Sequence, residues 1–324
     1  PPVPDGALSP MKILVLLGGS SSEREVSLAS GARVADALRS RGHEVTTADP
    51  GADPLAILPE ARAAEVVWMA LHGGAGEDGT IQALFDLAGV CYTGSGHLAS
   101  ALAMDKDLSK RIFRSTGVPT AEWRMLRRGD GTDFATPAYV EATVTALGLP
   151  VVVKPSKEGS TVGLTVVKVA ADLPAAIRTA FAHDDEVMLE TFVSGRELTV
   201  GILGDLVMPV GEIIPKHELY DYECKYTPGM AEELFPAPIP DAVRDEVQRH
   251  TRRAYEALKL AGCARIDFRW HPTDGLFCLE ANTLPGMTGT SLVPQAAQAM
   301  GIGFPELCER IALDAVARRA GRTS

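Results

Sequence analysis

The sequence predicts a multidomain protein, with a parallel α/β domain at the N-terminus and α+β architecture after it. In the first part of the chain apolar strand patterns alternate with helical patterns: 13–17 precedes 27–39, and 66–71 precedes 81–87. Such alternation is typical of a parallel sheet. After Pro150 the pattern changes to β-branched runs separated by turn residues, which indicates hairpins. The length of 324 residues also exceeds that of one typical domain.

The remaining elements follow from the same patterns. Between the two parts we expect one helix over 104–116, which ends before Pro119. The later part is expected to contain a hairpin of 151–154 and 162–169, strands at 197–203 and 206–214, a Pro-rich surface loop at 220–240, a helix at 241–260 and a last hairpin over 265–282. Residues 1–10 lack the basic start and the apolar segment of a secretion signal, so we expect a disordered extension or a cloning remnant there.

The composition excludes several classes of function. A formal net charge of −11 argues against sequence-independent binding to nucleic acid or to an anionic membrane, because both favour clustered Lys and Arg. The longest apolar runs fall far short of the about 20 residues that a membrane helix needs. The five cysteines show no C-x-x-C pair and no Cys/His spacing of a zinc site. We therefore expect free thiols in a reducing compartment, the cytoplasm.

The last hairpin is the most informative segment, because charged and apolar residues alternate along it. If the turn comprises the four residues 272–275, pairing sets Asp267 opposite Glu280 and Arg265 opposite Asn282, all on one polar face. Carboxylate and amide oxygens are ligands of hard cations such as Mg²⁺, held together with substrate phosphates. An adjacent Arg can hold a phosphoryl group through its planar fork. For such a hairpin alone, a cross-strand salt bridge on a solvated face is the alternative.

A second polar segment is the loop at 155–161, which lies between two predicted strands. Small residues and glycine let backbone N–H groups approach phosphate oxygens, Ser160 offers a hydroxyl, and Lys154 supplies a positive charge. The spacing is not that of a P-loop, and the Gly18-Gly19 turn lacks the G-x-G-x-x-G fingerprint of dinucleotide binding. The segment therefore predicts a hairpin that covers phosphates, with ordinary turn chemistry as the alternative when it is taken alone.

Taken together, these segments resemble the D-alanine:D-alanine ligases of the ATP-grasp superfamily, and the resemblance covers nearly all of 11–316. The motifs occur in order: GGSSSEREVS at 18–27, HGGAGEDG at 72–79, MDK at 104–106, KPSKEGSTVG at 154–163, YDYECKY at 220–226, and EANTLPGMT at 280–288 with Ser291-Leu292 after it. The resemblance implies an N-terminal substrate domain over 11–104 and a two-part ATP-grasp fold. Its central subdomain spans 105–190, and its C-terminal subdomain, over 191–324, carries a lid loop and the metal site.

The same resemblance implies the nucleotide and metal contacts. ATP would be contacted by Lys106, Lys154 and Lys225, with Glu190 and Glu197 on the adenine and ribose side. Two Mg²⁺ or Mn²⁺ ions would be held by Asp267, Glu280 and Asn282. Whether a monovalent cation also binds is not decided by the resemblance.

For the amino acids, the resemblance implies that two D-alanine molecules are joined through a D-alanyl phosphate. Glu23 would bind the ammonium of the first, with His72 nearby, and Ser160 would link Glu23 to Tyr226 when the 220–240 lid closes. The carboxylate of the second would lie near Ser291 and Leu292. The tetrahedral oxyanion would be stabilised by Arg265 and by the backbone N–H of Gly286.

Two departures and two alternatives accompany this reading. Thr161 stands where many relatives carry a second serine. Gly289-Thr290 replaces a larger or more polar pair, so the packing around the second substrate is expected to differ from that of such relatives. Tyr226 after Lys225 favours an amine over a hydroxy acid as the second substrate. A D-alanine:D-lactate or D-alanine:D-serine ligase and a non-catalytic nucleotide-binding protein are the alternatives. The family further implies peptidoglycan precursor synthesis and a homodimer through the N-terminal domain.

Overall fold

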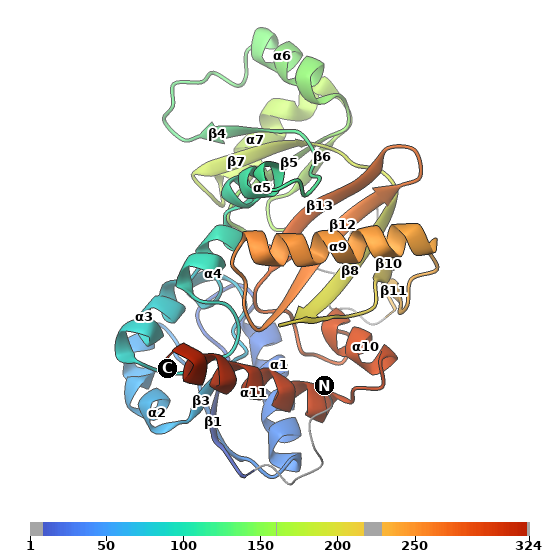
Figure 1. Ribbon diagram of the computed structural model, residues 1–324. Helices are drawn as coiled ribbons and strands as arrows, with labels where there is room; N and C mark the ends of the chain where they lie inside the picture. The colour runs from blue at the N-terminus through green and yellow to red at the C-terminus, as the bar shows by residue number, and fades with distance from the viewer. Residues whose placement is uncertain (1–8, 160, 217–228, 323–324) are drawn as a thin grey trace.

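The computed structural model describes residues 9–159, 161–216 and 229–322. Within these ranges the elements form three layers, each built around one sheet (Figure 1). The N-terminal layer lies at the bottom of Figure 1, the sheet of the central segment at the top, and the sheet of the C-terminal segment between them. The predicted combination of a parallel α/β domain with antiparallel sheets is confirmed.

The N-terminal layer is built on the predicted parallel sheet. β1 (Lys12–Leu16) lies between β2 (Glu44–Ala48) and β3 (Val66–Met69), and both pair with it in parallel. The helices of this layer are α1 (Arg24–Ser40), α2 (Leu58–Ala63), α3 (Thr80–Ala88) and α4 (His97–Met104), with 3-10 turns at Pro54–Ile57 and Gly74–Gly76. The polar turns that follow β1 and β3 therefore lie at the same edge of the sheet.

The predicted helix over 104–116 is confirmed as α5 (Lys106–Ser115), although it begins two residues later than predicted. α4 ends at Met104, and α5 begins after Asp105. The backbone of Asp105 is extended, and its side chain accepts the N–H of Leu108. An Asp in this arrangement caps a helix N-terminus, so it sets the start of α5 after Asp105 and not at Met104. The break makes Lys106 the first residue of α5.

The central layer is an antiparallel sheet of order β4-β7-β5-β6. Its strands are β4 (Trp123–Arg127), β5 (Val151–Pro155), β6 (Thr165–Val167) and β7 (Glu186–Thr191). α6 (Pro137–Leu147) and α7 (Leu173–Phe181) belong to this layer, with a 3-10 turn at Ala170–Asp172. The predicted hairpin of β5 and β6 is confirmed, although its second strand is shorter than 162–169.

The C-terminal sheet has the order β11-β10-β8-β12-β13, and β9 pairs with β8. Its strands are β8 (Arg196–Leu203), β9 (Leu206–Val207), β10 (Gly211–Pro215), β11 (Ala231–Leu234), β12 (Cys263–His271) and β13 (Gly275–Asn282). The predicted strand 206–214 is divided into β9 and β10, and Pro209, which has no N–H for a ladder, lies in the gap. The predicted surface loop 220–240 contains β11, which pairs with β10.

Helices complete the C-terminal part and connect it to the first layer. α9 (Asp241–Ala257) ends before the predicted residue 260 and lies across the sheet of β8, β12 and β13 (Figure 1). After α10 (Leu292–Ala299), α11 (Phe304–Arg322) returns to the N-terminal layer and packs against α1. The indole N–H of Trp68 in β3 donates to the carbonyl oxygen of Cys308 in α11 at 3.2 Å. None of the helices in the described ranges is long and apolar enough to cross a membrane.

Candidate active site

The register of the last hairpin brings the predicted metal ligands together. Asp267 of β12 pairs with Glu280 of β13, and Arg265 pairs with Asn282. The apolar residues between them, such as Ile266, are buried in the core beneath the sheet. All four polar residues therefore share the opposite face, as the alternation of side chains along the strands predicts.

The turn of this hairpin is shorter than the predicted 272–275, because Gly275 pairs with His271. If the two strands paired without a bulge, a turn of this length would set Asp267 opposite Leu279. The Glu280 side chain would then point to the other face of the sheet. A β-bulge prevents this slip: Phe268 pairs with Cys278, the next pair is Asp267 with Glu280, and Leu279 has no partner in the register.

Asp267 is held by two neighbours on its own sheet. The Thr199 hydroxyl of β8 donates to its Oδ1 at 2.7 Å, and the Arg265 guanidinium donates to both carboxylate oxygens at 2.8 to 3.1 Å. Because Asp267 is buried, these charge-assisted bonds fix the direction of its carboxylate.

Two cavities meet at this ribbon, and both are lined by Lys106, Gly159, Arg265 and Glu280. The first cavity opens toward the N-terminal layer. Its walls also include Glu23, His72, Asn282, Gly286, Ser291 and Leu292. The structure thus brings these predicted residues to one place, while their individual roles stay predictions.

Glu23 and His72 come from the two polar turns at the edge of the N-terminal sheet. The Glu23 Oε2 atom lies beside both glycine loops, since a Cβ added to Gly73 would be 3.0 Å from it and one added to Gly159 would be 3.4 Å away. His72 is buried, and its Nε2 atom lies 3.2 Å from Ser30 Oγ. Burial lowers the pKa of His72, so its imidazole is neutral at neutral pH. The pair offers one negative charge and one uncharged hydrogen-bonding ring.

The opposite wall of the first cavity is formed by the segment after β13. Ser291 Oγ accepts the backbone N–H of Thr288 at 2.9 Å. A Cβ added to Gly286 would lie only 2.8 Å from that oxygen, so a side chain at Gly286 would displace the serine hydroxyl. Glycine at this position keeps the backbone of 286 exposed to the cavity.

The second cavity lies between the central sheet and the C-terminal sheet. Its apolar lining includes Val152, Leu164, Phe192, Val193 and Leu279, and its charged lining includes Lys154, Glu190, Glu197 and Arg269. A cavity whose lining is partly apolar and partly charged suits a ligand that combines a flat base with phosphates.

The charged groups of the second cavity are paired with one another. Lys154 Nζ lies 2.6 Å from Glu190 Oε2, and Arg269 lies 3.0 Å from Glu197. Lys106 Nζ donates to the carbonyl oxygen of Glu158 at 2.6 Å and lies 3.7 Å from Glu280 Oε2. The Lys106 ammonium therefore connects the loop after β5 to the ribbon that carries the predicted metal ligands.

Two buried charged residues at the site are missing from the sequence prediction. Glu77 lines the first cavity and accepts the N–H of Gly73 at 2.7 Å; burial, reinforced by the charge of Glu23, raises its pKa to about 8. Lys110 is buried behind the second cavity and bonds to Glu190. Glu77 belongs to the HGGAGEDG motif, and Lys110 follows MDK by four residues, but no local pattern shows that either side chain is buried.

The donor set of the ribbon fits a hard cation. No group of three or more His, Cys, Asp and Glu side chains in the described part of the chain could hold a metal ion by itself. The predicted set, however, consists of two carboxylates and the carboxamide of Asn282, which share one face of the ribbon. Two or three oxygens from protein, completed by phosphate and water, are typical of Mg²⁺ bound together with a nucleotide.

Several predictions concern residues outside the described ranges. Ser160, Lys225 and Tyr226 belong to this group, so the proposed link from Glu23 through Ser160 to Tyr226 stays a prediction. Cys224 is also outside, whereas the cysteines at 91, 263, 278 and 308 are free and buried. Burial raises the pKa of the Cys263 thiol to about 12, so this side chain behaves as a small apolar group.

Comparisons with known proteins agree with this geometry. A family model described as D-ala D-ala ligase C-terminus matches residues 112–312, and one described as D-ala D-ala ligase N-terminus matches residues 51–95. The D-alanine–D-alanine ligase of Syntrophotalea carbinolica is 46% identical over 312 residues, which cover 96% of this chain and 98% of that protein. The ligase of Citrifermentans bemidjiense is 47% identical over 304 residues, or 94% of this chain and 96% of that protein.

Solved structures give the same result. The crystal structure of D-alanine–D-alanine ligase from Bacillus anthracis complexed with ATP matches with a TM-score of 0.84 and 31% identity, covering 97% of this chain and 100% of that one. Sequence identity of this extent over nearly the whole length, together with the shared fold, establishes descent from a common ancestor. The chain therefore belongs to the D-alanine–D-alanine ligase family.

Proposed function

We propose that this chain joins two D-alanine molecules to D-alanyl-D-alanine, with cleavage of ATP to ADP and phosphate and with D-alanyl phosphate as the intermediate. One observation carries the proposal: Arg265 and Glu280 line both cavities, so a group bound in the first can react with a group bound in the second. The first cavity has the charges for an amino acid, and the second has the shape and charges for a nucleotide.

In the first step the bound carboxylate attacks the γ-phosphorus of ATP. The ammonium of the first D-alanine pairs with Glu23, which leaves its carboxylate directed toward Lys106 and Arg265 on the wall shared by the cavities. A carboxylate oxygen forms the new O–P bond, the bond from the γ-phosphorus to the bridging oxygen breaks, and ADP leaves with that electron pair. Lys106 and Lys154 supply positive charge to the phosphates.

In the second step the amine of the second D-alanine attacks the carbonyl carbon of the acyl phosphate. Arg265 and the backbone N–H of Gly286 stabilise the oxyanion of the tetrahedral intermediate. The C–N bond forms, phosphate leaves with the electrons of the C–O bond, and the proton that the amine loses is taken up by that phosphate. Ser291 and Leu292 lie on the wall that would hold the carboxylate of this second substrate.

The metal ligands proposed for this reaction are Asp267, Glu280 and Asn282. Bound Mg²⁺ or Mn²⁺ would neutralise charge on the phosphate oxygens of the nucleotide. The Arg265 and Thr199 bonds to Asp267 keep its carboxylate in place for that task. Closure of the 220–240 segment over the cavities, with Ser160, Lys225 and Tyr226, is proposed to exclude water, because an acyl phosphate exposed to water would hydrolyse.

Beyond the reaction, we propose a role in peptidoglycan precursor synthesis in the cytoplasm, where ATP is available, and a homodimer formed through the N-terminal layer. To test the function, the purified chain is incubated with ATP, Mg²⁺ and D-alanine, and the products are identified by mass spectrometry. ADP, phosphate and D-alanyl-D-alanine are expected; their absence contradicts the proposal. Competition with D-lactate or D-serine near neutral pH distinguishes the alternative acceptors from D-alanine.

A further inference from the structure

Lys110 has no place in the reaction as described, yet its side chain is completely buried beside the nucleotide cavity. It lies on α5, its side chain has an exposed fraction of 0%, and it is not among the residues that line either cavity. Its ammonium bonds to Glu190 Oε1 and to the hydroxyl of Thr120. A buried lysine is costly unless its charge is paired, so Glu190 is the group that keeps it in place.

Glu190 is shared between two lysines, one on each carboxylate oxygen. Lys110 occupies Oε1, and Lys154 lies 2.6 Å from Oε2. Of these three residues, Lys154 and Glu190 line the second cavity and Lys110 does not. Burial alone would raise the pKa of Glu190, but the charges and hydrogen bonds of Lys110 and Lys154 lower it to about 2, so this carboxylate is ionised at neutral pH.

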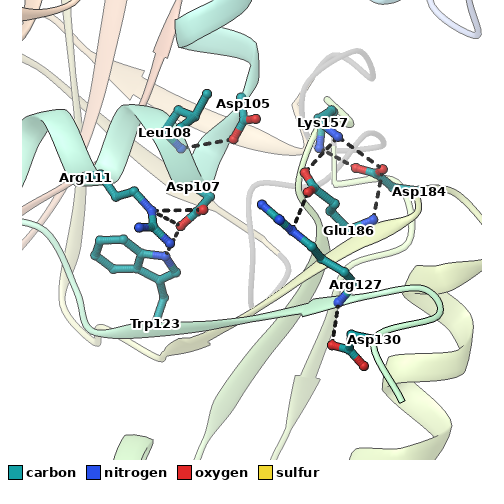
Figure 2. Close-up of polar contacts among 10 residues, drawn as sticks. All are labelled: Asp105, Asp107, Leu108, Arg111, Trp123, Arg127, Asp130, Lys157, Asp184 and Glu186. Atoms are coloured by element: carbon teal, nitrogen blue, oxygen red, sulfur yellow. Dashed lines mark hydrogen bonds and ion pairs between the residues drawn. The ribbon is translucent and has the colours of Figure 1, made fainter. Parts of the chain in front are cut away.

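The surroundings of Lys110 keep water away from this pair. Its Nζ atom lies 5.1 Å from the centre of the Trp123 ring, in the range of a cation–π contact. The Trp123 indole N–H donates to Asp107 Oδ1 at 2.7 Å, and Arg111 Nε donates to both oxygens of the same carboxylate at 3.0 Å, as Figure 2 shows. The indole is thus held by its own hydrogen bond against the Lys110 ammonium.

The charges of the three groups explain why two lysines are needed. Without Lys110, the negative charge of Glu190 would cancel the positive charge of Lys154. The pair would then have no net charge with which to attract a polyphosphate. Burial lowers the pKa of Lys110, but the charge of Glu190 acts in the opposite direction and favours the ammonium form. With both lysines protonated, the three groups carry a surplus of one positive charge, and Lys154 is the one of the two lysines that faces the cavity. Inside a cavity of low dielectric, one surplus charge beside a phosphate has a large effect on binding.

We propose that Lys110 is a positioning residue for nucleotide binding: it compensates the charge of Glu190, so that the Lys154 ammonium stays available to the phosphates of the nucleotide. The inference rests on the proposed function only in that the second cavity binds ATP. Lys110 itself touches neither substrate. This role differs from a packing role, because loss of the Lys110 charge is expected to weaken binding of the phosphates and to leave binding of the base unchanged.

The test measures binding of ADP and of adenosine by isothermal titration calorimetry and compares the ratio of their dissociation constants. For Lys110→Met, which keeps the length of the side chain and removes its charge, ADP binding is expected to weaken about tenfold while adenosine binding changes less than about twofold. Lys110→Arg, which keeps the charge, is expected to preserve the preference for ADP. Equal losses for both ligands, or no loss for either, would overturn the proposal.

A rescue experiment separates charge compensation from local packing. In the double variant Lys110→Met with Glu190→Gln, no carboxylate competes for Lys154, so the preference for ADP over adenosine is expected to return to within about threefold of the unsubstituted protein. If Lys110→Met does not fold, the double variant and Glu190→Gln alone still decide the question: a reduced preference in both contradicts the proposal. Lys12→Met, which removes an exposed lysine of β1, serves as the control, and thermal unfolding checks that each variant is folded.

Because the ratio depends on nucleotide binding alone, it can be measured whether or not the unsubstituted protein forms the dipeptide. Failure of product formation would contradict the proposed function. An unchanged ratio would contradict only the role of Lys110.

Discussion

Asp267 pairs with Glu280, although the turn that joins their strands has one residue fewer than this pairing would need without a bulge. The bulge at Leu279 restores the pairing, and Leu279 lies on the wall of the second cavity, which is proposed to bind the nucleotide. A bulge at this place therefore serves two purposes, since it sets the spacing of two proposed metal ligands and supplies an apolar side chain to the neighbouring slot.

The pairing predicts that Glu280 is needed for metal binding. Glu280→Gln keeps the shape of the side chain but removes a charge from the donor set, so the Mg²⁺ concentration for half-maximal activity should rise about tenfold or more. Binding of Mn²⁺ in the presence of ADP, followed by electron paramagnetic resonance, should weaken in parallel. Asp274→Asn, in the exposed turn of the same hairpin, is the control and should change neither quantity. Equal metal affinity in Glu280→Gln and the parent would remove Glu280 from the metal site.

Arg265 is predicted to act on the chemical steps more than on nucleotide binding. Its guanidinium forms the fork on Asp267 and lines both cavities. Arg265→Ala should lower kcat by at least about 100-fold, because it removes a donor to the oxyanion, while the dissociation constant of ATP changes much less. Turnover and ATP binding are measured on the same preparation. Unchanged kcat would exclude Arg265 from the mechanism.

The loop predicted to cover the phosphates lies close to the turn between α7 and β7 near both of its ends. Asp184 Oδ2 accepts the N–H of Lys157 at 2.9 Å, and a Cβ added to Gly163 would lie 2.7 Å from the His183 ring. Figure 2 shows the Lys157 ammonium between Asp184 and Glu186, at 3.9 Å and 2.8 Å.

Asp184→Ala is therefore predicted to loosen the loop and to admit water. The KM for ATP should rise several-fold, and ADP should form in excess over dipeptide, because part of the acyl phosphate hydrolyses. The ratio of ADP to dipeptide is measured in the same reaction. Asp185→Ala is a matched control, since the exposed Asp185 side chain pairs only with Arg128 among the contacts described. A ratio of one ADP per dipeptide in Asp184→Ala would contradict this role of Asp184.

Glu77 predicts a stability that depends on pH. Its pKa is about 8 in the folded protein, above the ordinary value of 4.5, so the folded state binds more protons than the unfolded state between these values. Stability from this group is fully present below about pH 4.5 and is lost as pH rises through about 8. Glu77→Gln removes that loss and should raise the free energy of unfolding at pH 8 by up to about 4 kcal/mol, with little effect at pH 4.5.

Chemical denaturation at several pH values checks this prediction. Glu25→Gln, on the exposed face of α1, is the control and should leave the pH dependence unchanged. The same pH dependence in Glu77→Gln as in the parent would show that Glu77 is ionised in the folded protein.

The sequence predicts the site best where its geometry depends on local alternation. The faces of β12 and β13 follow from a period of two, so the grouping of Asp267, Glu280 and Asn282 is predictable. The length of the turn is not predictable from the sequence, because a short turn with a bulge and a longer turn without one give the same pairing of Asp267 with Glu280. In the same way, the helix predicted over 104–116 is found, but its first residue is fixed by the Asp105 cap at Lys106.

Buried charges are the part that local patterns do not predict. Lys110 and Glu77 have ordinary helical and turn neighbours in sequence, and their burial results from contacts with segments far along the chain. Lys110 is buried by its partner Glu190, 80 residues later, and by Trp123. Only packing of the three layers shows that these charges lie inside the protein.

Isotope transfer tests the central claim, activation of a carboxylate by phosphorylation, most directly. D-alanine labelled with ¹⁸O in both carboxylate oxygens is incubated with unlabelled ATP, Mg²⁺ and the enzyme, and the phosphate released is analysed by mass spectrometry. If the carboxylate attacks the γ-phosphorus, one ¹⁸O atom from the amino acid appears in phosphate for each dipeptide formed. Phosphate without ¹⁸O, formed together with dipeptide, would contradict the acyl phosphate mechanism.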